Sequence, residues 1–357
     1  MFSRRHFIVT STALTAGVMS TTPAFAALDA KDADIKFGTT GSIYGVWNKN
    51  GDMIKSTNMR MMLSDIKHYG LEGFEPYSDQ AAPWYNKPLE LKALAKEIGV
   101  EIASVGDLPI KPGTPPAPKP APGAAPNYSW LGGEGQKKLI ADMEACARDF
   151  LQPLGVDHWK NNMGPRPPGG PSKDQLKGLV ETANEIGMRT KKHGVRLSLH
   201  AHMWGPMERE PDFRYVMEHT DPNYVYLIMD TGHNVLGGMD TVKIVDEFFP
   251  RITEFHLKDT FPQYRGNKAG PTPADHKKKS VYASVGQGGG VDFPGIFAVM
   301  RKKHFKGWAV FDIDAPRPGD GTGSVDDNIA ASVNYMRSAL GVKLPAATGK
   351  GGLFKEG

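Results

Sequence analysis

The sequence predicts a single (β/α)8 barrel, and three observations lead to this fold class. Short β-rich runs alternate with helical runs about eight times along the chain, which is typical of strand–helix units that feed a parallel sheet. Roughly 330 residues remain after an export-type N-terminal segment, which is enough for one large barrel. No Gly-x-Gly-x-x-Gly turn follows the first strand, and this disfavours a dinucleotide-binding fold.

Residues 1–26 have the features of an export signal. Arg4 and Arg5 precede a modestly apolar run rich in Thr and Ala, and Ala24-Phe25-Ala26 is a small-x-small cleavage pattern. The paired arginines indicate twin-arginine export. The apolar run is too short and too polar for a permanent membrane span. We therefore expect a periplasmic mature protein that begins at Ala27 and has no membrane anchor after cleavage.

The barrel domain is predicted to cover residues 27–340. Its strands are expected, in order, at 35–39, 73–76, 101–105, 157–161, 196–200, 224–229, 252–256 and 308–311. Helical runs between them are expected at 58–69, 89–98, 136–150, 173–193, 240–249 and 293–303. Because each strand is followed by a helical or long connecting segment, all strands can run parallel in one closed sheet.

Three segments fall outside this alternation of strands and helices. Residues 109–126 are rich in Pro, Ala and Gly, form neither helix nor ladder, and follow the third strand. We expect them to be a loop on the carboxyl-terminal face of the barrel, either a solvated spacer or an arm at the rim. Residues 260–290 form a second long loop, and long loops in compact domains are often functional. Residues 341–357 are predicted to be a flexible tail.

Charge and cysteine content exclude some classes of protein. The formal charge is +4 and falls to +2 once Arg4 and Arg5 are removed, and basic residues are scattered apart from Lys277-Lys278-Lys279. A nucleic-acid partner would require a basic face, so we expect none. The single cysteine, Cys146, excludes an intrachain disulfide, and its helical context predicts a small buried group.

Polar residues follow each of the last four predicted strands, where a (β/α)8 barrel carries its active site. His200 ends strand five, Asp230 strand six, His256 strand seven and Asp312 strand eight. We expect these four side chains to converge as metal ligands. His202 or Asp314 could replace the ligand on its own strand, since residues two apart point the same way.

Two imidazoles and two carboxylates suit one divalent transition metal. Mixed nitrogen and oxygen donors favour Mn²⁺, Fe²⁺, Co²⁺ or Zn²⁺ over Ca²⁺, and the lack of thiolates argues against a structural zinc site. The sequence therefore predicts a single catalytic metal ion rather than a structural one.

Several motifs resemble those of xylose-isomerase-like sugar isomerases, epimerases and dehydratases. They are Met229-Asp230-Thr231-Gly232-His233, His256-Leu257-Lys258-Asp259, and Val285-Gly286-Gln287-Gly288 leading to Val291-Asp292-Phe293. Within that superfamily, the segments His200-Ala201-His202-Met203, Thr220-Asp221-Pro222 and Gly307-Trp308 are most similar to the inosose dehydratase family. The resemblance covers roughly residues 35–340. It implies one divalent ion, frequently manganese, held by strands five to eight.

The sequence departs from the ketose 3-epimerases at two positions. Those enzymes carry a proton-moving glutamate at strand five and another at strand eight, where this chain has His200 and Asp312. The departure disfavours epimerisation by two opposed bases. Dehydration, isomerisation or another elimination stays open.

The shared chemistry of the superfamily is removal of a proton from carbon beside a carbonyl, which requires a base within hydrogen-bond reach. We expect His202 to be this base, with Glu75, His233 and Lys258 as the other catalytic candidates. Glu75 lies at the end of strand two and faces either the substrate or a buried lysine such as Lys258.

The expected substrate is a free sugar, a cyclitol or an oxidised glycoside, because no phosphate-binding Gly-rich loop is evident. Trp159, Trp204 and Phe261 lie near predicted strand ends, where aromatic rings can stack on a sugar face, and Asp259 is a further candidate for substrate binding. A homo-oligomer is compatible with the sequence. Two alternatives stay open: an exported sugar-binding accessory protein without turnover and, disfavoured by the charge, a metal-dependent endonuclease.

Overall fold

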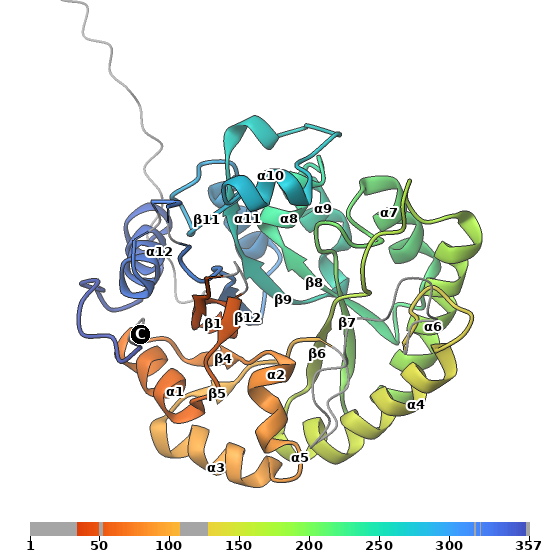
Figure 1. Cartoon of the computed structure of the whole chain (residues 1–357), viewed down its shortest axis with the longest axis horizontal. Coiled ribbons are helices and arrows are strands. Elements are labelled where there is room, and N and C mark those ends of the chain that lie inside the picture. Colours follow the sequence, from red (N-terminus) through yellow and green to blue (C-terminus); the bar gives the residue numbers. More distant parts are fainter. Residues whose placement is uncertain (1–33, 50–52, 108–127, 318, 322, 355–357) are drawn as a thin grey trace, which may run out of the picture.

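The computed structural model describes residues 34–49, 53–107, 128–317, 319–321 and 323–354. Eight parallel strands form one sheet in the order β5-β4-β1-β12-β9-β8-β7-β6. Isolated parallel bridges from Tyr77 to Gly106 and from Gly106 to Lys160 join the two ends of this sheet. Figure 1 shows the strands at the centre of the molecule and the helices around them. The predicted barrel is therefore confirmed.

Each predicted strand is present, with small differences at the ends. The barrel strands are β1 (Ile35–Thr40), β4 (Gly73–Glu75), β5 (Glu101–Ile102), β6 (His158–Asn161), β7 (Arg196–His200), β8 (Val225–Asp230), β9 (Ile252–Leu257) and β12 (Gly307–Phe311). The largest difference is β5, predicted at 101–105, where regular pairing ends at Ile102 and the chain reaches β6 only through the Gly106 bridge.

One long helix follows each barrel strand and packs on the outside of the sheet. These helices are α1 (Met59–His68), α3 (Pro88–Ile98), α4 (Gln136–Cys146), α6 (Lys173–Lys191), α7 (Glu210–His219), α9 (Thr241–Phe248), α11 (Phe293–Lys302) and α12 (Val325–Leu340). A π-helical stretch at Ala147–Leu151 and the short α5 (Gln152–Leu154) extend α4. Helices α7 and α12 had not been delimited from the sequence.

Short helices and strands lie at the end of the barrel where the strands finish. They are the hairpin β2 (Gly45–Trp47) with β3 (Met53–Lys55), the helices α2 (Ser78–Ala81), α8 (Thr231–Leu236) and α10 (Pro273–Lys278), and the pair β10 (Asp259–Thr260) with β11 (Tyr282–Ala283). The predicted long loop at 260–290 thus contains α10 and β11. Because these elements follow strands at their carboxyl ends, they surround the site described below.

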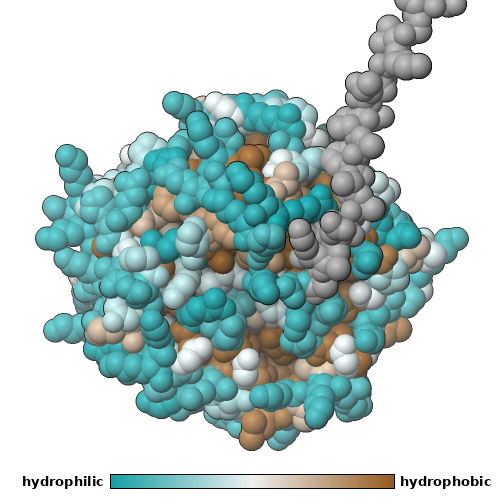
Figure 2. Space-filling view, turned by 180° about the vertical axis from the view of Figure 1, so that it is seen from behind, coloured by the Kyte–Doolittle hydropathy of each residue, from teal (hydrophilic) through white to brown (hydrophobic). Residues whose placement is uncertain are grey.

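Apolar side chains fill the space between the sheet and the helices. Phe74, Leu199, Phe255 and Phe311 are fully buried in one continuous cluster, and Cys146 is buried with them, as expected. Figure 2 shows the outside from behind as mainly hydrophilic, with apolar residues visible between the polar ones. Burial of such side chains is the main force that holds the helices on the sheet.

The end of the described chain is packed against the barrel. Val342 and Leu344 are buried, the main-chain N–H of Leu353 donates to Asp65, and that of Gly352 donates to Asp326. For residues 342–353 this packing differs from the flexible tail that we predicted at 341–357, because the segment carries apolar residues that become buried; residues 355–357 lie outside the described part of the chain.

Two of the predicted segments lie outside the described residues. They are the predicted export signal at 1–26 and the Pro-rich loop at 109–126. Within the part of the chain that the structure describes, helices long and apolar enough to span a membrane are absent.

Candidate metal centre

Four side chains meet at the carboxyl ends of neighbouring strands. His200 comes from β7, Asp230 from β8, His256 from β9, and Asp312 directly follows β12. One ligand atom of each lies within 4.8 Å of the others, and all four residues are buried. The structure thus brings together the predicted set, and on strands five and eight it is His200 and Asp312 that converge, rather than His202 and Asp314.

Asp230 is placed by the first turn of α8. Its Oδ1 caps this helix by accepting the main-chain N–H of His233 at 2.7 Å, while its Oδ2 lies 3.4 Å from His200 Nε2. Asp is a preferred residue at this capping position. A side chain at Gly232 would lie 3.0 Å from the carbonyl oxygen of Lys258, so glycine lets α8 approach β9 closely. The Asp-Thr-Gly-His motif therefore orients one carboxylate oxygen toward the centre.

The other three donors are oriented in the same way. Asp312 Oδ1 accepts from the hydroxyls of Thr40 at 3.0 Å and Ser42 at 3.1 Å. His200 Nδ1 lies 2.6 Å from Asn162 Oδ1. His256 Nε2 lies 3.2 Å from Glu75 Oε2, which leaves Nδ1 without a hydrogen-bond partner among the described residues. Each contact holds the atom of its side chain that does not face the centre.

This arrangement fits a divalent metal ion. His256 Nδ1 lies 3.5 Å from Asp312 Oδ2 and 3.9 Å from Asp230 Oδ2. Metal–ligand bonds of about 2.1 Å in a tetrahedral site place donors roughly 3.4 Å apart, so small shifts would bring these atoms into coordination. Histidine ligands held through their second nitrogen by a carboxylate or amide are typical of metal sites.

The electrostatics of three of the four donors also suit a cation. For the fourth, burial lowers the pKa of His256, but Glu75 and Asp312 outweigh this and hold it well above its ordinary value, so a divalent ion would have to displace a ring proton. Burial, with the charge of Lys160 as the second cause, holds the pKa of His200 well below its ordinary value, so its ring is neutral. Burial raises the pKa of Asp312, but the Lys258 ammonium and the His256 ring outweigh this and hold it well below the usual range. Burial and repulsion from Asp312 raise the pKa of Asp230 to about 7. A divalent ion would relieve this repulsion.

Two further histidines lie beside the centre. His202 Nδ1 lies 2.6 Å from the carbonyl oxygen of Met203, and only a protonated Nδ1 can donate there. Burial lowers the pKa of His202, so the ring is neutral and Nε2 is an acceptor. The ring centres of His202 and His233 are 3.9 Å apart. His233 therefore packs against His202 and supports the orientation of its ring.

Lys258 lies at the opposite side of the centre from β6. Its Nζ is 3.0 Å from Asp314 Oδ1 and 3.4 Å from Asp312 Oδ2, and it stands over the ring of Tyr282 at 4.4 Å. Burial lowers its pKa, but the charges of Asp312 and Asp314 outweigh this and raise it above the ordinary value. Lys258 is thus a permanent cation, and the expected alternative of a Glu75–Lys258 pair is not formed.

Two predicted substrate-binding residues are placed elsewhere. Trp159 is 1% exposed and packs in the hydrophobic core outside the sheet, because it alternates with the inward-facing His158 and Lys160. Asp259 accepts main-chain N–H groups of Gly288, Gly289 and Val291 and thereby holds the loop after β11. The structure therefore commits both side chains to other contacts, Trp159 in the core and Asp259 in a loop.

Trp204 does lie at the rim of the site, as expected. It lines a cavity of about 500 Å³ together with His200 and His202. Its backbone has a φ of 60°, uncommon for a tryptophan, and its indole Nε1 donates to the carbonyl oxygen of Pro271.

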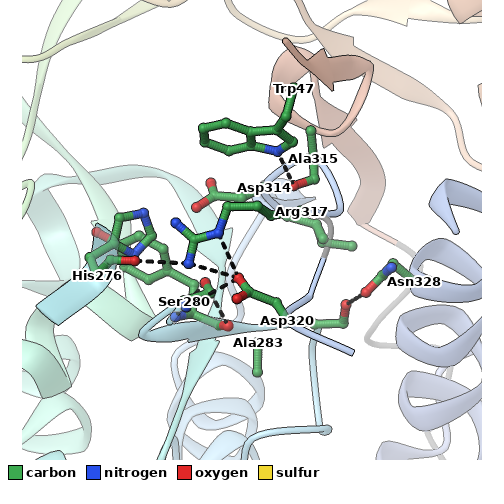
Figure 3. Close-up of a pocket in the computed structure, with 12 residues that line it drawn as sticks. Trp47, His276, Ser280, Ala283, Asp314, Ala315, Arg317, Asp320 and Asn328 are labelled. Atoms are coloured by element: carbon green, nitrogen blue, oxygen red, sulfur yellow. Dashed lines mark hydrogen bonds and ion pairs between the residues drawn. The ribbon is translucent and has the colours of Figure 1, made fainter. Parts of the chain in front are cut away.

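A second, narrower hollow lies beside Asp314. Figure 3 shows Trp47 above it, with the Arg317 guanidinium between Asp320 and His276. Arg317 donates to the Asp320 carboxylate and to the carbonyl oxygen of His276, so its charge is already satisfied. The described rim of the barrel thus offers pockets on two sides of the centre.

Several supporting residues had not been identified from the sequence. Thr40, Ser42 and Asn162 hold ligands, and the buried Lys160 points inward from β6. Beneath the centre, Glu254 joins Glu75 and His256 in a second buried group that could also hold an ion. The signal for Lys160 that the sequence offered is its spacing from His158. Polar residues two positions apart on a barrel strand point to the same side, here the inside of the barrel.

Comparisons with known proteins agree with this fold. A family model described as the xylose isomerase-like TIM barrel matches residues 63–339. An inosose dehydratase of Mesomycoplasma hyopneumoniae (strain 7448) is 28% identical over 176 residues, which are 47% of this chain and 56% of the relative. The chain thus matches about half the length of this curated relative.

Solved structures show the same fold at low identity. A sugar phosphate isomerase/epimerase from Parabacteroides distasonis has a TM-score of 0.61 at 18% identity, covering 90% of this chain and 99% of that one. The IOLI protein with a bound zinc atom has a TM-score of 0.62 at 14% identity, covering 85% and 98%. Since the family model covers most of the barrel, this chain belongs to the xylose isomerase-like TIM barrel family.

Proposed function

We propose that this protein is a divalent-metal-dependent enzyme that removes a proton from the carbon beside a carbonyl of a sugar, cyclitol or keto-glycoside. Elimination or isomerisation then completes the reaction. One observation carries the proposal: four buried donors converge, and the second atom of each is held by the protein. The curated relatives named inosose dehydratase support the substrate class and the dehydratase type.

The donor set would hold one ion, with manganese as the first choice and iron, cobalt or zinc as alternatives. A solved neighbour with a bound zinc atom supports metal binding in this fold. When bound, the ion supplies a Lewis acid that stabilises negative charge developing on the substrate carbonyl. His202 supplies the base through Nε2, and burial keeps its ring neutral for this role. Lys258 offers a permanent N–H donor to a substrate oxygen.

The proposal is tested with metal-loaded mature protein in deuterated water. Inosose, 3-keto-glucosides and simple ketoses are incubated separately, and the products are identified. We expect deuterium beside the carbonyl together with dehydrated, cleaved or isomerised product. Clean inversion at one carbon would contradict the reaction class, and binding without any exchange would favour the accessory sugar-binding alternative.

Substitution of the proposed base separates catalysis from metal binding. His202→Ala should keep its metal yet lose about 10²–10⁴-fold in turnover, since a general base contributes that much. The control is His219→Ala, which removes an exposed histidine at the end of α7. It should leave metal content and turnover unchanged. Normal turnover in His202→Ala would assign the base to another residue.

A further inference from the structure

Lys160 is a fully buried cation that the proposed reaction does not yet use. Its side chain is 1% exposed on the inner side of β6. Its Nζ lies 3.3 Å from Asp107 Oδ1 and 4.6 Å from the centre of the Tyr77 ring. Asp107 Oδ1 also accepts from Asn162 Nδ2 at 2.8 Å. An ammonium has three N–H donors, and within the described residues this shared oxygen is the only hydrogen-bond acceptor that Lys160 Nζ contacts.

Within the described residues, Glu75 lacks a hydrogen-bond donor where Lys160 lacks acceptors. Its Oε2 faces His256, while its Oε1 is buried and has no hydrogen-bond partner among the described residues. A side chain at Gly106 would place its Cβ 3.5 Å from Lys160 Nζ and 3.7 Å from Glu75 Oε1. A free donor and a free acceptor therefore approach the same point, and buried polar groups of this kind normally have partners.

The backbone around Lys160 is held under strain. Asp107 has a φ of 72°, in the left-handed region that non-glycine residues seldom adopt. Through its carboxylate it holds both Lys160 and Asn162, and Asn162 in turn holds His200. Strained residues persist where surrounding contacts impose them and are concentrated at functional sites. Lys160 is thus fixed relative to the candidate metal ligand His200.

We propose that Lys160 and Glu75 bind the substrate hydroxyl that departs during elimination, and that Lys160 donates the proton to it. The assignment rests on the proposed function. A hydroxyl group is both donor and acceptor, so it can accept from Lys160 Nζ and donate to Glu75 Oε1. This subsite lies on the β4 and β6 side of the barrel, across from Lys258 and Asp314 on the β9 and β12 side.

The protons and electrons of this step balance. His202 Nε2 takes the proton from the carbon beside the carbonyl, and the electron pair is first delocalised onto the carbonyl oxygen. That pair then becomes the new carbon–carbon double bond as the adjacent carbon–oxygen bond breaks. The departing oxygen takes a proton from Lys160 Nζ and leaves as water, and the proton on His202 returns to Lys160 through solvent. Burial lowers the pKa of Lys160, but Asp107 and Glu75 outweigh this and raise it, so the amine is protonated. Hydroxide is a far stronger base than a lysine amine, so the proton transfer to it is favourable.

The test compares two leaving groups in one pair of variants. Lys160→Met removes the donor, and Lys55→Met is the matched control because Lys55 Nζ also stands over the Tyr77 ring, at 3.8 Å, and pairs with the half-exposed Asp79. Each protein is given a β-hydroxy ketose and its β-fluoro analogue, since fluoride leaves without a proton. We expect Lys160→Met to lose about 10²–10⁴-fold in water elimination. Fluoride elimination, deuterium exchange and metal content should stay within a few-fold of wild type.

Lys160→Arg keeps the positive charge beside Asp107 and serves if the methionine variant does not fold. It should show the same selective loss, because a guanidinium does not release its proton. Equal losses for both leaving groups, or no loss for either, would overturn this assignment alone. A wild-type protein that neither exchanges nor eliminates would overturn the proposed function and the assignment with it.

Discussion

The carboxylate of Asp230 acts through both of its oxygens, because one caps α8 and the other faces His200 and His256. Asp230→Ala should therefore lose its metal, since removal of one donor weakens a four-donor site severely. Asp240 caps α9 in the same manner, through the main-chain N–H of Lys243, but it is not one of the four converging donors. Asp240→Ala should lose about 1 kcal/mol of stability and keep its metal. Elemental analysis measures the metal content of both variants. Full metal occupancy in Asp230→Ala would contradict the ligand assignment.

His158 joins two carboxylates beneath the centre. Its ring nitrogens lie 2.6 Å from Asp157 Oδ1 and 2.6 Å from Glu254 Oε2. Burial lowers the pKa of His158, but the hydrogen bonds to Asp157 and Glu254 outweigh it and raise the pKa to about 9. The protonated ring thereby neutralises charge in the lower part of the barrel.

This raised pKa predicts a loss of stability in alkali. The contribution of His158 is complete below its unfolded pKa of about 6.5 and is lost as the pH rises through about 9. Because burial raises the pKa of Glu254 even beside this ring, part of the gain is offset, and we expect a change of roughly 1–3 kcal/mol. Denaturant unfolding from pH 6 to pH 10 should show the stability difference between wild type and His158→Gln shrinking. A difference that is constant with pH would exclude a protonated ring.

Among the secondary elements, the loop between β11 and α11 depends on one carboxylate. Asp259 accepts from the main chain of Gly288, Gly289 and Val291, and a side chain at Gly288 would lie 2.0 Å from the carbonyl oxygen of Thr260. The Val-Gly-Gln-Gly motif is therefore a device for bringing the loop against β10, rather than a substrate site.

Asp259→Ala should release this loop. Since hydrogen bonds to a charged group are worth about 1.5–3 kcal/mol each and some water replaces them, we expect a net loss of roughly 2–4 kcal/mol. Amide hydrogen exchange should quicken at 284–291. Asp275→Ala, which removes an exposed cap of α10, is the control and should lose about 1 kcal/mol or less. Unchanged exchange at 284–291 in Asp259→Ala would contradict the role assigned to this carboxylate.

At the scale of the whole molecule, the described part of the final segment, residues 342–354, packs near the first helix, α1. Deletion of residues 342–357 exposes the pocket that Val342 and Leu344 fill and leaves Asp65 without the Leu353 N–H. We expect a fall of roughly 2–5 kcal/mol in the free energy of unfolding, because each buried aliphatic side chain contributes about 1.5–3 kcal/mol. Deletion of 355–357 alone is the control. Equal stability of the two truncated proteins would show that this packing contributes little.

Delivery of the whole protein is a separate prediction. Changing Arg4 and Arg5 to lysine should leave precursor in the cytoplasm, because the twin-arginine pathway reads that pair. Cell fractionation measures how much precursor stays in the cytoplasm. As a control, a cysteine-free secreted reporter fused behind residues 1–26 shows whether this segment acts without the rest of the chain. Normal export of the double variant would exclude the twin-arginine route while leaving secretion by another route.

The amino-acid sequence alone determined the order of strands and helices and the positions at which ligands had to be sought. Both follow from local rules: apolar runs of strand length alternate with helical periodicity, and polar residues at strand ends of a barrel face one site. His200, Asp230, His256 and Asp312 could therefore be predicted together, each from the residues just before it.

Only the tertiary structure decided how each of these side chains is used. The Asp312 carboxylate is held by Thr40, 272 positions away, and His256 by Glu75, 181 positions away. Trp159 faces the core, and Lys160, its neighbour, faces the site. The register of distant strands and the paths of the returning loops set these contacts, and no local pattern in the sequence records them, because they depend on pairing across the barrel.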